Sequence, residues 1–474
     1  MAKLTTQEIR DVSEGIIQAV DPAVCPKNSL ALAVNFVFDK ILGRAVLRGG
    51  TSQLGAQLVT GKPILGLYEH ITAAGTKVPI AIVDDASSTN ADIWKYSSGW
   101  SIAHADITAG AKCRFLTFLD TTVAFNGTDK LTTADGSTWV HTAGNLDAAN
   151  IPAGTMGCEW QDKIYVAGIS ATKNRLVYST TPTGGSIAWS GGNSGNMDVE
   201  PEEGAGPITA LAKTPGYLII LKERSLKRWD GSSTYPESLV KVGTYSQENV
   251  VMGKQSVYYF NKRGIFETAG AYPRKISRRI QDIIEAIPSS SYSAVNGWCD
   301  EEHVYFAIGN ITIYDQTLEN CVICYTIDSQ NWTLLSFPFA IKRWSQLVDS
   351  NGDETMIVGD STGKVWNMFD GDDDAGTAIN WMIRYQTLEF GSRGRTKDLS
   401  KFVVYGKNAS GIMLARANET GNFNPMGNIS KSVNELTRDL HGNYFEIQLQ
   451  GKGKNTQIIG IEFPEISINE NYSD

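Results

Sequence analysis

Short apolar strands separated by turn residues recur along most of the chain, and this repetition restricts the fold more than any other feature. "VPIAIVDD" is followed by "DIWKYSSGWSIAH", and "ITALAKTPGYLIILKE" is followed by "SLKRWDGSS". Such units recur about every 42–51 residues, which is the period of a four-stranded propeller blade. About seven units fit between residues 63 and 370, so the pattern predicts a β-propeller of seven blades, with six as the alternative.

The composition supports an all-β fold. Glycine contributes 46 of the 474 residues, and few windows show the periodicity of a helix, which is typical of a chain with many tight turns. Four tryptophans follow turn residues at similar places in the units, namely Trp100, Trp139, Trp189 and Trp332. We interpret them as packing between blades; the alternative is a surface on which glycans stack.

The acidic stretch "DGDDDAG" at 370–376 marks a boundary. The alternating strands after it predict a C-terminal antiparallel β-sandwich over 371–474. The propeller is assigned to 25–370 and an N-terminal arm to 1–24. Helical patterns are expected at 5–20 and 281–287. The segment 30–50 is predicted to be a β-hairpin that leads into the ring or closes it by pairing with the last blade.

The sequence contains no recognised motif for catalysis or metal binding. The five histidines lack metal-ligand spacing, and no GxSxG, Walker or GxGxxG pattern occurs. The six cysteines are scattered and are read as free thiols, with "CVICY" as a buried strand. Carboxylates are plentiful on loops, but nothing selects a glycosidase pair. We therefore expect no enzymatic activity, no cofactor and no metal. No secretory signal and no membrane-spanning stretch is predicted.

One charged segment stands out in a chain of net charge −9. That net charge argues against a general nucleic-acid coat and leaves local basic patches as candidates. The candidate interface or DNA-channel residues are Lys262, Arg263, Arg274, Lys275, Arg278 and Arg279. Three destinations remain open for these side chains: solvent, carboxylates of a neighbouring subunit, or DNA phosphates.

Several stretches together resemble a known family. "CPKNSLALAVNFVFDKILGRAVLRGG" carries Pro26, Asn28, Asn35, Gly43, Arg48 and Gly49 in the order of such a family. Next, "SVYYFNKRGIFET" runs through "KIS" into "RRIQDIIEAI", and "IRYQTLEFG" and "QIIGIEFPEI" follow near the end. In the order of these segments and in their residue patterns, the chain resembles the tail nozzle and head-to-tail stabilisation proteins of short-tailed bacteriophages.

The resemblance implies a structural virion protein. It implies a homo-oligomeric ring, hexameric in the family, that stabilises packaged DNA and contacts portal, adaptor and other tail proteins. DNA would pass the ring with weak, non-specific contacts, and no membrane insertion is expected. The location would be the virion tail, after assembly in the host cytoplasm. Two alternatives remain: a glycan-binding or glycan-cleaving propeller, such as a receptor-binding spike, and a general interaction scaffold in a bacterial cell.

Overall fold

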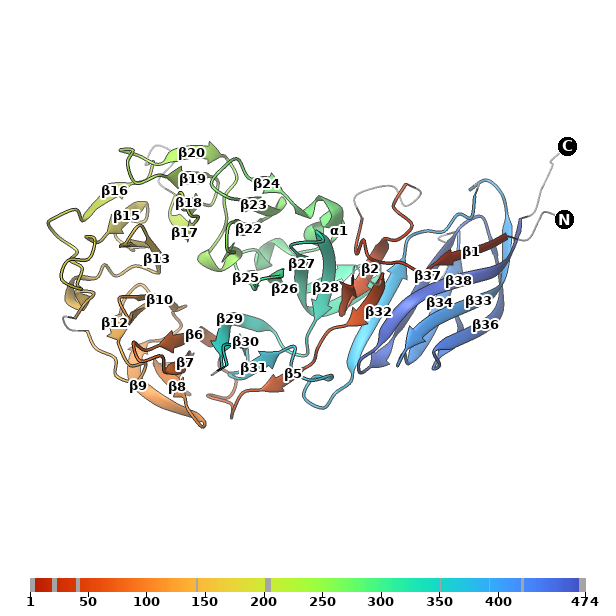
Figure 1. The fold of residues 1–474 in the computed structure, drawn as a ribbon, viewed down its shortest axis with the longest axis horizontal. Helices are drawn as coiled ribbons and strands as arrows, with labels where there is room; N and C mark the ends of the chain where they lie inside the picture. Colours follow the sequence, from red (N-terminus) through yellow and green to blue (C-terminus); the bar gives the residue numbers. More distant parts are fainter. Residues whose placement is uncertain are drawn as a thin grey trace.

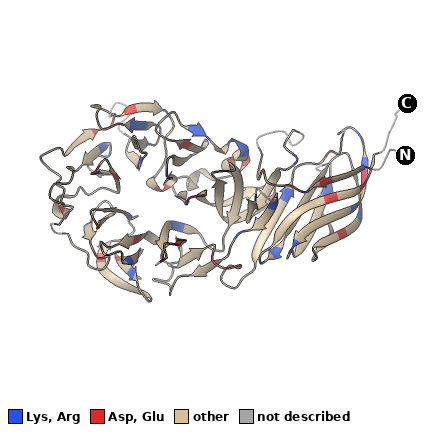
Figure 2. Ribbon diagram, in the orientation of Figure 1, with Lys and Arg blue, Asp and Glu red and all other residues tan. Residues whose placement is uncertain are grey.

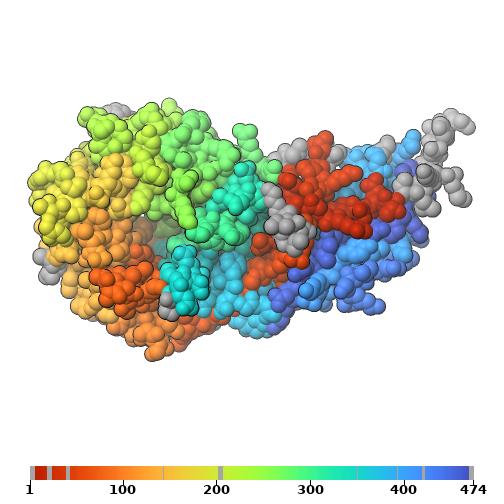
Figure 3. Space-filling model, in the orientation of Figure 1, coloured from red at the N-terminus to blue at the C-terminus, as the bar shows by residue number. Residues whose placement is uncertain are grey.

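The computed structural model describes residues 5–18, 24–39, 43–141, 144–200, 206–349, 351–391, 393–418 and 422–468. Figure 1 shows a ring of small sheets joined on one side to a second group of longer strands. In the space-filling view the two parts form one elongated body, and the N-terminal segment lies over the C-terminal strands (Figure 3).

Within the described residues, the first strands of seven sheets contact one another in a closed cycle. The cycle runs through β6 (Ile64–Ile71), β10 (Arg114–Phe118), β13 (Met156–Trp160), β17 (Ile208–Lys213), β21 (Val250–Met252), β25 (Asn296–Cys299) and β29 (Ile341–Val348), and returns to β6. These strands begin blades 1 to 7, and antiparallel strands follow each of them. The predicted β-propeller is confirmed.

The outer strands complete the blades. In chain order they are β7 (Lys77–Asp84), β8 (Asn90–Tyr96), β9 (Trp100–Thr108), β11 (Thr121–Phe125), β12 (Lys130–Thr133), β14 (Lys163–Ala167), β15 (Arg175–Tyr178), β16 (Gly195–Asp198), β18 (Leu218–Lys222), β19 (Leu226–Trp229), β20 (Glu237–Val240), β22 (Val257–Asn261), β23 (Gly264–Thr268), β24 (Arg274–Lys275), β26 (His303–Ile313), β27 (Gln316–Thr326), β28 (Asn331–Ser336), β30 (Glu354–Asp360), β31 (Val365–Met368) and the earlier strand β5 (Thr51–Gln53). The short helices are η1 (Ala148–Asn150), η3 (Gln247–Asn249), η4 (Ser277–Ile280), η5 (Ser289–Ser291) and α1 (Gln281–Glu285). The helix predicted at 281–287 is therefore confirmed.

Every pair of neighbouring blades buries an apolar cluster. Trp139 belongs to the cluster between blades 1 and 2, and Trp332 is fully buried beside Tyr325. Trp100 and Trp189 pack at the edges of two further clusters. The four tryptophans thus pack between blades, as predicted. The strand "CVICY" is also buried as expected, with Cys321 and Cys324 as free thiols.

The ring closes through a strand that precedes blade 1 in the sequence. Strand β5 pairs antiparallel with β31, so the outer strand of blade 7 comes from residues 51–53. The predicted hairpin exists as β3 (Phe36–Asp39) and β4 (Arg44–Leu47). It does not close the ring: β4 pairs with β38 (Gln457–Ile468) instead. A Cβ on Gly50 would lie 1.9 Å from the carbonyl oxygen of Asp373, so the closing segment needs glycine at this position.

Arg48 joins the closing strand to the rest of the molecule. Its Nη1 and Nη2 donate to the two carboxylate oxygens of Asp374 at 2.9 and 2.7 Å. The remaining donors reach Asn35 Oδ1 and the carbonyls of Gly49 and Ser336 at 2.8–3.0 Å. All five guanidinium N–H groups are therefore satisfied, although the side chain is 0% exposed. Its plane also lies 4.2 Å from the centroid of the Phe337 ring.

The C-terminal strands are divided between two sheets. One contains β3, β4, β38, β33 (Lys397–Lys407) and β36 (Val433–Gly442). The other continues the sheet of blade 6 through β2 (Leu30–Val34) into β32 (Ile379–Tyr385), β37 (Phe445–Gly453), β34 (Gly411–Ala417) and β35 (Asn424–Ile429). Because this sheet is continuous with the propeller, the structure does not show a separate C-terminal sandwich. The boundaries 1–24, 25–370 and 371–474 stay predictions.

The N-terminal helix expected at 5–20 is wrong for all the described residues of this range, 5–18. Residues Thr5–Ile9 form strand β1, which pairs antiparallel with β38. Pairing satisfies the free edge of β38, which a helix over the same residues would leave open. Ile9 also packs against the largest apolar cluster.

A group of charged side chains crosses the central channel of the ring. This channel cluster consists of Lys112, Arg114, Glu248 and Arg343. Glu248 Oε1 accepts from Arg114 Nε at 2.8 Å and lies 3.8 Å from Arg343 Nη1, while Oε2 lies 3.5 Å from Lys112 Nζ. Arg114 and Arg343 also donate to carbonyls of Thr155 and Leu65. The cluster therefore connects blades 1, 2, 3, 5 and 7.

We expect the channel cluster to contribute to acid sensitivity through Glu248. Burial alone would raise the pKa of this carboxyl, but the cations of Arg114, Arg343 and Lys112 lower it from 4.5 to about 2. Since the folded-state pKa lies below that of the unfolded chain, the stabilisation is complete above about pH 4.5 and is lost as pH falls towards 2. In Glu248→Gln, the unfolding free energy measured with urea should fall less steeply across this range. The exposed Glu237→Gln is the control; identical curves for both variants and the wild type would contradict the expectation.

The Arg48 contacts generate a second prediction. Arg48→Gln leaves the carboxylate of Asp374 buried without its cation, so the unfolding free energy should fall by about 3–5 kcal/mol. The control Arg10→Gln removes an ion pair to Glu8 whose side chains are 58% and 52% exposed, and should cost less than about 1 kcal/mol. Urea unfolding of the two variants makes the comparison. Equal losses of unfolding free energy in the two variants would show that Arg48 does not stabilise the pairing of β5 with β31 that closes the ring.

Candidate functional site

The antiparallel blades give the ring two distinct faces. We call the N-face the one where the first strands of the blades begin, and the C-face the one where they end. Because strands alternate in direction, the turn between the second and third strands of a blade lies on the N-face. Residues 223–225 form this turn in blade 4, and Lys262 and Arg263 form it in blade 5.

Two adjoining cavities of about 480 and 630 Å³ lie at these turns. They share Val242, Lys262 and Arg263 in their walls. The cations that line one or both cavities form what we call the basic surface: Arg224, Lys241, Lys262, Arg263, Lys275 and Arg278. Only two carboxylates, Glu223 and Glu285, line the same cavities. The basic surface therefore carries a local excess of positive charge.

Most cations of the basic surface have no partner of their own. Lys275 Nζ donates to Gln281 Oε1 at 2.5 Å. Its pKa is lowered, first by burial and then by the charge of Arg278. Among the described residues, no acceptor or carboxylate pairs with the other five side chains, all of which are exposed. Anionic groups from outside the chain could therefore approach them without displacing an internal ion pair.

The structure separates the predicted residues into two groups. Lys262, Arg263, Lys275 and Arg278 come together on the basic surface. Arg274 instead pairs across strands with Glu267 at 2.7 Å, and Arg279 pairs with Glu14 at 3.1 Å. In Figure 2, Lys and Arg positions are marked along β24 and on the segment that leads into α1.

Sequence reasoning missed Arg224 and Lys241. The repeat itself contained a signal for the first of them. "LIILKERSL" in blade 4 and "VYYFNKRGI" in blade 5 align so that Arg224 matches Arg263, both in the turn between the second and third strands. Lys241 follows β20 in a connection between blades, and no comparable repeat signal marks it.

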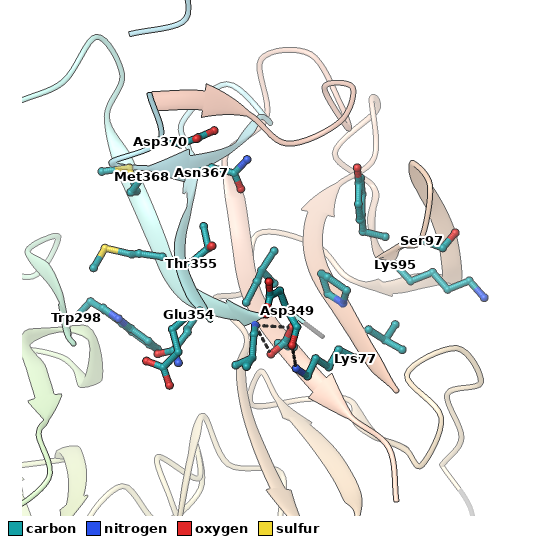
Figure 4. Close-up of a pocket in the computed structure, with 18 of the residues that line it drawn as sticks. Lys77, Lys95, Ser97, Trp298, Asp349, Glu354, Thr355, Asn367, Met368 and Asp370 are labelled. Carbon is teal, nitrogen blue, oxygen red and sulfur yellow. Dashed lines mark hydrogen bonds between the residues drawn. The ribbon is translucent and has the colours of Figure 1, made fainter. Parts of the chain in front are cut away.

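A larger cavity lies on the other face. It measures about 1090 Å³ and is lined by residues at the C-face turns of blades 1, 6 and 7. Its charged lining residues are Glu69, Lys77, Lys95, Asp300, Asp349, Glu354 and Asp370, so carboxylates outnumber cations. Figure 4 shows Trp298 and Glu354 on the side of blades 6 and 7, and Lys77 donating to the backbone carbonyl of Asp349. Burial raises the pKa of Glu69, whose carboxylate accepts from the backbone of Val348.

Two other kinds of feature are absent from the described residues. No group of three or more His, Cys, Asp and Glu side chains in these ranges is arranged to hold a metal ion. Within the same part of the chain, the helices are too short and too polar to span a membrane.

Neither a protein-family model nor a curated protein matches the chain. Among solved structures, "YCF48 bound to D1 peptide" is 11% identical, with 67% of this chain and 96% of that chain covered and a TM-score of 0.40. The Pan2 WD40 domain of Neurospora crassa is 7% identical, with coverages of 68% and 97% and a TM-score of 0.40. The AfRom2 CNH domain is 8% identical, with coverages of 67% and 99% and a TM-score of 0.39. Likenesses at these identities concern the fold alone.

The basic surface generates a third prediction. The double variant Lys262→Gln/Arg263→Gln should change stability by less than about 0.5 kcal/mol, because neither side chain has a partner among the described residues. It should also elute from a heparin column at lower salt, since fewer cations displace counterions from the polyanion.

A matched control removes the same charge from paired sites. Arg10→Gln/Lys254→Gln takes away two cations that pair with Glu8 and Glu301. It should elute close to the wild type. If both double variants elute at equally lowered salt, retention depends only on net charge. The basic surface would then not be a preferred site for polyanions.

Proposed function

We propose that the chain is a structural, non-enzymatic component of a phage tail. In this proposal, copies assemble into a ring around the DNA channel, stabilise packaged DNA and link to neighbouring tail proteins. The observation that carries it is the basic surface: an acidic chain of net charge −9 presents five exposed cations that no described side chain neutralises. Such a surface is suited to an anionic partner outside the chain, either carboxylates of a neighbouring copy or DNA phosphates.

In this proposal, DNA passes between copies of the chain and not through the propeller. The channel cluster crosses the propeller axis, and the cavity there measures only about 550 Å³. The axis of each propeller would therefore be closed to DNA, and each propeller would form part of the wall of the ring. The order of segments that resembles the phage family supports the proposal, and so does the elongated body (Figure 3). The C-terminal strands, as a β-sandwich, would form the second contact region of each copy.

The mass of the chain in solution tests this proposal. We expect a ring of several copies, hexameric by the family resemblance, or one that forms only when a portal or adaptor protein is added. Light scattering gives the mass, and electron micrographs of the chain with and without those partners show the ring. A monodisperse monomer that ignores both partners would contradict the proposal.

The C-face cavity favours a second candidate, a glycan-binding or glycan-cleaving propeller. Aromatic and carboxylate side chains together are suited to sugars, and this cavity combines Tyr96 and Trp298 with several carboxylates. A monomer that binds immobilised glycans, and loses binding in Glu354→Gln, would favour this candidate over the tail proposal.

A further inference from the structure

The channel cluster contains more positive charge than the structure neutralises. Three cations, Lys112, Arg114 and Arg343, surround the single carboxylate of Glu248. The side chains of Glu248 and Arg343 are only 9% and 11% exposed, and that of Arg114 is 19% exposed. The enclosed side chains therefore carry one positive charge more than Glu248 neutralises, which is costly unless an ion of opposite sign accompanies it. Lys112, which is 45% exposed, adds a second positive charge at the edge of this group.

The cations also repel one another. Burial lowers the pKa of Lys112, Glu248 raises it, and the charges of Arg343 and Arg114 lower it again. Burial likewise lowers the pKa of Arg343, with Glu248 acting against it and Arg114 adding to it. An anion held between Lys112 and Arg343 would relieve this repulsion.

There is room and there are free donors for such an anion. Arg114, Glu248 and Arg343 line a cavity of about 550 Å³ on the propeller axis. Arg343 uses Nε and Nη1 for the carbonyls of Leu65 and Lys342. Among the described residues, its Nη2 has no acceptor. Lys112 Nζ lies 3.5 Å from Glu248 Oε2, which accepts no hydrogen bond from the described residues, so this ammonium also keeps donors available.

We infer that this end of the central channel binds a small, doubly charged oxyanion of the phosphate type. An oxyanion with two charges matches the excess of two positive charges in the cluster. The Nη2 group of Arg343 and the ammonium of Lys112 are charged donors of the two kinds that bind phosphate oxygens. Glu248 fixes Arg114 through two nitrogens and so keeps the cations in place.

The anion could be a free ion or a phosphate group of a nucleic acid. Lys112 and Arg114 lie at the start of a first strand, so the site is on the N-face, as is the β22–β23 turn of the basic surface. Both sources present the same oxygens to Arg343 and Lys112. This inference does not require the ring of the proposed function.

The test is titration calorimetry of the full chain with inorganic phosphate, at constant ionic strength maintained with sodium chloride. Lys112→Gln and Arg343→Gln should each weaken binding by about tenfold or more, the effect of losing one charge-assisted hydrogen bond. Glu248→Gln should tighten binding, because it removes the competing negative charge. The control Arg10→Gln/Lys254→Gln removes two cations that pair with Glu8 and Glu301, and it should bind phosphate like the wild type.

The variants keep the inference testable if one of them fails to fold. Lys112 is 45% exposed, so its replacement should leave the fold intact and can decide the result without Arg343→Gln. A parallel titration with a short single-stranded oligonucleotide separates the sources: binding of the oligonucleotide alone, weakened by Lys112→Gln, assigns the site to nucleic-acid phosphate. No binding of either probe, or equal binding by wild type and Lys112→Gln, would overturn the inference.

Discussion

The ion pair between Arg48 and Asp374 is the interaction on which the rest of the structure depends. The chain segment around it serves two parts of the molecule: β3 and β4 belong to a sheet of the C-terminal strands, while β5 completes blade 7. A buried pair of charges adds little net stability over an apolar pair of the same size. Its effect here is to specify geometry, because the five donors of Arg48 are satisfied only when the closing strand, the end of blade 6 and residues 373–374 meet in one register.

The ring was predictable from the sequence because its cause is periodic. Each blade needs apolar strands at a fixed spacing, and the apolar clusters between blades are the direct result. The closing strand was not predictable in the same way. "TSQ" is polar and only three residues long, and backbone pairing with β31 and contacts such as Thr51 to Asp374 hold it in place. The hairpin within 30–50 has a stronger apolar pattern, which is why it was a candidate for closing the ring. Its buried side chains Phe36 and Ala45 instead pack in the apolar cluster that includes the C-terminal strands.

The candidate site was predictable only in part for a similar reason. Six cations were predicted as a group because they lie close together in the sequence. The turn of blade 5 and the end of β24 do bring four of them together in the structure. Arg279 leaves the group because its partner Glu14 lies 265 positions away in the sequence, a distance across which no local pattern gives information. The channel cluster is equally hard to predict: its members lie just before and at the start of β10, in η3 before β21, and within β29. Only closure of the ring makes them neighbours.

Two patches on opposite faces of the propeller differ in charge, and this difference bears on how copies could assemble. Excess cations lie on the N-face, at the channel cluster and the basic surface, whereas the larger cavity, on the C-face, has more carboxylates than cations. A two-fold pairing that brings either patch against its own copy would oppose like charges, which disfavours association. A head-to-tail contact would oppose unlike charges, and contacts of this type close into rings when the rotation between copies allows it. In the proposed tail ring, therefore, electrostatics favours neighbours related by rotation about the ring axis over neighbours related by a two-fold axis.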